Sequence, residues 1–115
     1  MNVAPVNNAQ FGAVNVKTTQ GIVSRATKAN LNELSEIFEG DIFISSVSGK
    51  IAKSYPRHHV INVMATKQFA PQRMLTESRT ILIPKKNGED MVSAQLTENA
   101  YDLTKRVSDR AHNVK

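Results

Sequence analysis

A stripe of apolar residues predicts one long helix in the C-terminal part of the chain. Its members are spaced three or four positions apart, and they are Val92, Leu96, Ala100, Leu103, Val107, Ala111 and Val114. This spacing keeps the side chains on one helical face. Glu89 and Asp90 suit the positive N-terminal end of such a helix, which we expect to end near residues 112–113. A shorter helix from Thr97, after an added strand at residues 91–95, is the alternative.

Two strands are predicted before this helix. In residues 58–67 the odd positions Ile61, Val63 and Ala65 are apolar, whereas the even positions are mixed. This two-residue period predicts a strand with one dry face. The helix stripe needs a surface on which to be buried, and the dry face is the nearest candidate.

The second strand, residues 74–84, has a hydroxyl-rich face and an apolar face. The first face holds Thr76, Ser78 and Thr80, and the second holds Leu75, Ile81 and Ile83. Glu77 and Arg79 are charged exceptions on the apolar side. We expect residues 69–74 to form a surface loop between the strands and residues 85–88 to form a turn before the helix.

The N-terminal half is predicted to add more sheet. Residues 1–12 lack any period and indicate a flexible N-terminal arm that is disordered alone or ordered only against a neighbour. Residues 13–24 predict a strand, a turn and a second strand, that is, an N-terminal β-hairpin. Residues 41–47 predict a strand that ends in a turn or bulge at the next glycine. Residues 50–56 are expected to be extended or a loop.

Residues 29–40 are ambiguous between helix and strand. Asn30 with Glu33 resembles a capping box, and Gly40 occupies the position of a glycine that follows a helix. Helical spacing is also present, at Leu31, Leu34, Ile37 and Phe38. These local signals favour a short helix, although alternate apolar positions leave a strand open.

Composition restricts the class of protein. The chain has 115 residues, 40% of them apolar, which allows one domain, residues 1–115, with a modest core. The net charge is +5, and the Lys and Arg residues are scattered, as in a protein that meets a polyanion over a broad face. Ordinary solubility charge is the alternative explanation. There is no cysteine, no apolar run long enough for a membrane span and no signal-like leader. We therefore expect a soluble protein, intracellular when made.

Enzymatic chemistry finds little support in the sequence. His58 and His59 are the one catalytic-looking feature, but adjacent strand residues point to opposite faces, and the neighbouring sequence supplies no carboxylates or further histidines for a metal or a general base. The chain has no phosphate-binding, dinucleotide-binding, nucleophile-elbow or zinc-protease motif. Few aromatic residues are present, so a base-stacking platform is not supported. We expect no enzyme, no cofactor and no metal site.

The polar face of the predicted sheet is the remaining candidate site. Counting alternate positions through the strands aligns Ser46, Ser48 and Lys50 with Asn62, Thr76, Ser78 and Thr80, and places Lys53, Arg57 and His58 at the ends. Small hydroxyl and amide groups with lysines at the margin can bind phosphates and base edges. A plain solvated face is the alternative.

The chain resembles the coat proteins of single-stranded RNA bacteriophages. The segments that carry the resemblance are SYPRHHVINVMATK, TESRTILIP and AYDLTKRV, which look like the long central strands and the first helix of that family. The resemblance implies an α+β fold, with an N-terminal β-hairpin, an antiparallel β-sheet and a C-terminal amphipathic helix that packs on a dimer partner. In that family dimers build an icosahedral shell, and the sheet face opposite the helices binds a genomic RNA hairpin.

Carried onto this chain, the resemblance implies a capsid protein made in the bacterial host cytoplasm and located in the virion. Its partners would be a second copy, the larger shell and single-stranded RNA, with no membrane. Residues 69–74 would surround the symmetry axes of the shell. The implied RNA-binding residues are Ser46, Ser48, Lys50, His58, Asn62, Thr76 and Ser78.

Two further expectations concern self-association and the rival class of protein. The helix stripe has more apolar area than one small sheet needs, so Leu103 and Val107 are predicted to pack on a partner subunit. The rival is a small basic regulatory protein that binds nucleic acid as a dimer and does not assemble further.

Overall fold

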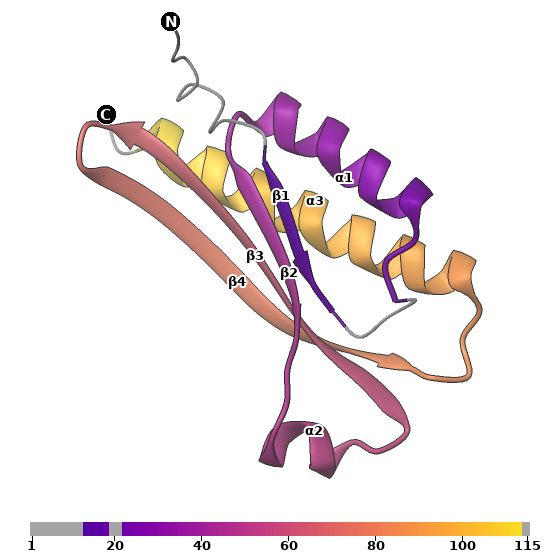
Figure 1. The fold of residues 1–115 in the computed structure, drawn as a ribbon. Coiled ribbons are helices and arrows are strands. Elements are labelled where there is room, and N and C mark those ends of the chain that lie inside the picture. The colour runs from indigo at the N-terminus through magenta and orange to yellow at the C-terminus, as the bar shows by residue number, and fades with distance from the viewer. Residues whose placement is uncertain (1–12, 19–21, 114–115) are drawn as a thin grey trace, which may run out of the picture.

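A mixed four-stranded sheet, covered on one face by two long helices, forms the body of the molecule in the computed structural model (Figure 1). The structure describes residues 13–18 and 22–113. The predicted N-terminal arm, most of the predicted turn at residues 18–21, and Val114 lie outside the described residues. The elements are β1 (Val14–Lys17), α1 (Arg25–Phe38), β2 (Asp41–Ser46), α2 (Lys50–Ser54), β3 (His58–Ala70), β4 (Arg73–Pro84) and α3 (Glu89–Asn113).

The α+β class is confirmed, but the N-terminal hairpin is wrong. The strand order is β1-β2-β3-β4, and β1 runs parallel to β2, whereas the other two pairs are antiparallel. A parallel neighbour needs a crossover, and α1 provides it. Ile22 and Val23 form a bend and not a return strand, and the Ile22 side chain is buried in the core as the chain enters α1.

Helix α1 confirms the helical interpretation of residues 29–40, but the helix begins and ends earlier than predicted, at Arg25 and Phe38. The N-cap is Ser24 and not Asn30: the Ser24 hydroxyl accepts a hydrogen bond from the Thr27 backbone N–H at 3.1 Å. At the other end, Glu39 takes the left-handed conformation, with φ of 60°. Gly40 follows as the link to β2.

Between β2 and β3 the chain forms α2, so the expectation of an extended segment or loop at residues 50–56 is wrong. The predicted strand before it is confirmed as β2, and Gly49 makes the turn with φ of 78°. Tyr55 ends α2 in a non-helical conformation, as expected for the residue before Pro56. In Figure 1 this short helix lies apart from α1 and α3, beyond the end of β2.

The core lies between the sheet and the two long helices. Along α3, the stripe positions Val92, Leu96, Ala100, Leu103 and Val107 are all buried, so the long helix is confirmed. From the sheet, Ile42, Ile44, Ile61, Val63, Ala65 and Ile83 meet that stripe and α1. Leu103 and Val107 are 1% and 0% exposed within this chain. The prediction that they pack on a partner subunit is therefore wrong.

The β3–β4 hairpin is longer and its turn is tighter than predicted. Residues 69–74 are not a loop, because β3 continues to Ala70 and β4 begins at Arg73. Gln72, in the turn, has φ of 65°. The register shifts between Gln68 and Ala70, which marks a bulge before the turn.

The charged exceptions on β4 reach helix α3. Arg79 pairs with Val63 in the sheet and thus points to the helix side, where its guanidinium contacts Asp102 at 2.6 Å. Glu77 forms an ion pair with Arg110 from the same side. Hydrogen bonds from Arg79, and then from Arg106, hold the pKa of Asp102 below its ordinary value. These pairs fix the edge of the sheet to the helix.

Candidate nucleic-acid interface

The face of the sheet opposite α1 and α3, here called the open face, is lined mainly by uncharged polar side chains. Alternation along each strand and the register across the sheet place these residues together. The open face comprises Asn15, Lys17, Asp41, Phe43, Ser45, His58, Val60, Asn62, Met64, Thr66, Gln68, Met74, Thr76, Ser78, Thr80 and Leu82. Its two charged members are Lys17 and Asp41, on β1 and at the start of β2. The centre of the face is neutral.

Hydrogen bonds between strands orient the polar side chains of the open face. The Asn62 side-chain amide donates to the Thr80 hydroxyl at 3.4 Å and to the Arg79 carbonyl at 3.5 Å. The Thr66 and Thr76 hydroxyls lie 2.9 Å apart and share a hydrogen bond. Such cross-strand contacts hold donors and acceptors in place at the surface, where they can meet base edges and sugar hydroxyls.

The structure brings together three of the residues predicted to bind RNA. Asn62 lies in the middle of β3, opposite Thr80, while Ser78 and Thr76 lie on β4 opposite Met64 and Thr66. Asn62 is half-buried, and both β4 residues are exposed. His58 begins the same β3 row and pairs with Pro84 at the far end of the hairpin.

The other three predicted residues do not share this face. Ser46 pairs with Ile61, so the register places it on the side of the helices. The alignment of Ser46 with Asn62 is wrong because even positions of β2 pair with odd positions of β3. Ser48 lies in the connection after β2, and Lys50 is the first residue of α2. Strand alternation does not apply to either of them.

Three residues of β2, Asp41, Phe43 and Ser45, belong to the open face and were missed. Ser45 pairs with Asn62, and Phe43 pairs with Met64 near the centre of the sheet. The signal was present, since Ile42 and Ile44 are apolar and alternate with them. A half-buried aromatic ring on an open sheet is a surface on which a base can stack.

Comparison with known proteins gives no template for this interface. No family model matches the chain, and neither does any curated protein or solved structure. Within the described residues no helix is both long and apolar enough to cross a bilayer. That part of the chain also has no group of three acidic or histidine side chains arranged to hold a metal ion.

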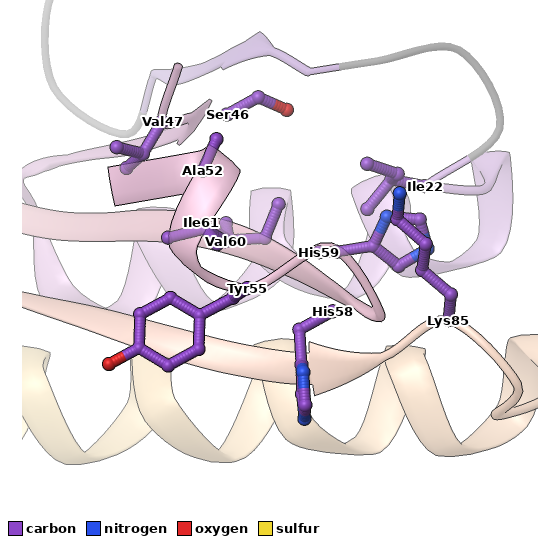
Figure 2. Close-up of a pocket in the computed structure, with 10 residues that line it drawn as sticks. All are labelled: Ile22, Ser46, Val47, Ala52, Tyr55, His58, His59, Val60, Ile61 and Lys85. Atoms are coloured by element: carbon purple, nitrogen blue, oxygen red, sulfur yellow. The ribbon is translucent and has the colours of Figure 1, made fainter. Parts of the chain in front are cut away.

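His58 and His59 point to different surroundings, as expected for neighbours on a strand. Figure 2 shows His59 beside Ile22 and Lys85, while His58 points away from them. The His58 ring meets the Tyr55 ring edge-on, with centroids 6.2 Å apart. Both histidines line a cavity of about 190 Å³. Burial, and then the charge of Lys85, lowers the pKa of His59 below 6.5.

This lowered pKa predicts an acid-sensitive contribution to stability. Below pH 6.5 the unfolded chain takes up a proton at His59 before the folded chain does, so the free energy of unfolding should fall as the pH falls through this range. His59→Gln should make the dependence shallower, as measured by urea denaturation at about pH 8 and about pH 5.5. His112→Gln, at the exposed end of α3, controls for the loss of an imidazole. An unchanged slope in His59→Gln would show that other groups set the acid response.

Proposed function

We propose that this chain is a coat subunit of the single-stranded RNA bacteriophage type, which forms dimers, assembles into a shell and binds RNA on its open face. One observation carries the proposal. In the described residues both long helices pack on the same face of the sheet (Figure 1). The opposite face is left open, and serine, threonine and asparagine side chains line much of it, beside Phe43, Met64 and Leu82. A surface of this chemistry can contact unpaired bases and ribose hydroxyls.

The free edge of β4 supports self-association. In the described structure this strand has 12 residues and pairs with β3 alone, so its outer edge presents backbone donors and acceptors. A second copy that added its β4 there would extend the sheet and double the area of the open face. The helices of both copies would stay on the other side.

The segments that carry the resemblance lie in β3, β4 and α3, the part of the fold with a long hairpin under a helix. The N-terminal part differs from the resemblance, since a β1–α1–β2 crossover stands where the coat family has a hairpin. The support for a coat function therefore comes from residues 54–107.

The rival regulatory protein is favoured by a different observation. The apolar stripe of α3 is already buried within one chain, so the fold needs no partner to cover Leu103 or Val107. Light scattering on the purified protein separates the two proposals. A coat subunit should form particles of megadalton mass that contain RNA, whereas a regulator should remain a dimer.

The RNA contact is tested at the centre of the open face. Asn62→Ala should weaken binding of a preferred RNA hairpin by about 1–3 kcal/mol, because the amide pairs with a base or sugar edge there. Asn32→Ala, on the exposed side of α1, removes the same group far from the sheet and should leave binding unchanged. Filter binding of both variants measures the difference. Equal affinity of the two variants would show that the open face is merely solvated.

A further inference from the structure

Two basic segments far apart in the sequence meet at the end of the β3–β4 hairpin away from its turn. The Lys85 backbone N–H donates to the Arg57 carbonyl at 2.9 Å, and His58 pairs with Pro84 in the last step of the ladder. Helix α2 lies against the same end through the ring contact between Tyr55 and His58. We call this region the basic end, and it comprises Lys50, Lys53, Arg57, His58, Lys85 and Lys86.

The nearest acidic residues to the basic end along the chain are Glu89 and Asp90, at the start of α3, and no ion pair in the described residues joins either of them to it. No acidic residue occurs between Asp41 and Glu77, or between Glu77 and Glu89. Ion pairs in the described part of the chain involve the arginines of β4 and α3 and none of the lysines or Arg57 of the basic end. The lysines and Arg57 of the basic end are all exposed.

The surface at the basic end is concave. A pocket of about 550 Å³ is lined by Pro56, Arg57, His58, Pro84, Lys85 and Lys86. The cavity in Figure 2 shares two of these residues, His58 and Lys85. The two prolines restrict the backbone at the pocket, and three cationic side chains, Arg57, Lys85 and Lys86, belong to its lining, where they can contact a phosphate.

We propose that the basic end binds the phosphates of an RNA strand whose bases lie on the open face. This inference rests on the proposed function and adds to it the site that neutralises the negative charge of the RNA phosphates. The open face is neutral at its centre, so phosphates must be neutralised elsewhere. His58 continues the β3 row of Asn62, and four strand steps separate them by about 13 Å. Between them lie Val60, which is 4% exposed, and its partner Leu82, which is 38% exposed, so a strand that leaves Asn62 passes Leu82 before it arrives at the basic end.

The experiment compares two double variants that lose the same charge. Lys85→Ala with Lys86→Ala removes two cations of the basic end, and Lys28→Ala with Lys105→Ala removes two exposed lysines from the helix layer. Binding of a labelled oligouridylate is measured by fluorescence anisotropy over a series of salt concentrations. Loss of two phosphate contacts should make the slope of log K against log salt shallower by about 1.4 and weaken binding roughly 10- to 100-fold at low salt. The control pair should keep the slope of the wild type.

Each outcome bears on the inference or on the proposed function. One outcome is that the basic-end variant and the control show equal changes in RNA affinity and salt dependence while Asn62→Ala still weakens binding. The basic end is then not the phosphate site, and the proposal that the open face binds RNA is retained. If the basic-end variant behaves as expected in a protein that forms no particles, the inference holds and the coat function falls. A wild-type protein without affinity for RNA would overturn both. Lys50→Ala with Lys53→Ala, on α2, provides a second variant should the first fail to fold.

Discussion

Replacing Leu103 by alanine should lower the free energy of unfolding by about 2–5 kcal/mol. The side chain is 1% exposed and lies in the core between α3 and the sheet. Truncation removes apolar contacts and leaves a cavity that the surrounding strands and helices can fill only in part. Urea denaturation, followed by circular dichroism, measures the loss.

The same variant tests where the helix stripe is buried. Because Leu103 packs within its own chain, the dissociation constant of the proposed dimer should be unchanged at temperatures where the variant is folded, as measured by sedimentation. Tyr101→Ala, two positions away and 59% exposed, should change stability far less. If Leu103→Ala weakened the proposed dimer with little loss of chain stability, Leu103 would pack on a partner subunit and not within its own chain.

Elements with a strong local period were predictable from the sequence. The apolar positions of α3 recur every three or four residues, a spacing that no strand could place on one face. The apolar positions of β3 recur every two residues, as a strand requires. The predicted boundaries at proline and glycine also agree with the structure, since Pro84 is the last residue of β4 and Gly88 precedes α3. In these segments local pattern and tertiary packing favour the same structure.

Pairing partners were not predictable in the same way. The alternation of β1 indicates a strand, but it does not indicate the strand with which β1 pairs. Val14 lies beside Ile42, and the whole of α1 separates the two residues in the sequence. The short α2 carries no apolar stripe, begins after Gly49 without a side-chain cap and has no buried residue. Nothing local distinguished it from a loop.

The candidate site shows the same division. The alternation within β3 and within β4 was predicted correctly, and Thr76 and Ser78 lie on the face of Asn62 because the register pairs even positions of the two strands. Across strands the register decides, and the register shift near Gln68 has no signature in the sequence. The misplacement of Ser46 was avoidable, because Ile42 and Ile44 mark the even positions of β2 as the buried ones.

The second large effect is expected at the link between α1 and β2. A Cβ atom added at Gly40 would lie 2.6 Å from the Thr66 carbonyl oxygen and 2.6 Å from a ring carbon of Phe38. Neither neighbour can easily give way, because Thr66 belongs to the backbone of β3 and the Phe38 ring is buried in the core. The Ser35 hydroxyl, which donates to the Gly40 carbonyl at 2.6 Å, further fixes the link.

Gly40→Ala should therefore destabilise the protein by about 1–3 kcal/mol through overpacking. Gly88→Ala is the matched control, because a Cβ there would meet nothing within 4 Å, and its effect should stay within about 0.5 kcal/mol. Thermal unfolding of both variants under one set of conditions gives the comparison. Equal stability of the two would mean that α1 and β2 can move apart at this link, and the close approach of Phe38 to β3 would then not hold the crossover in place.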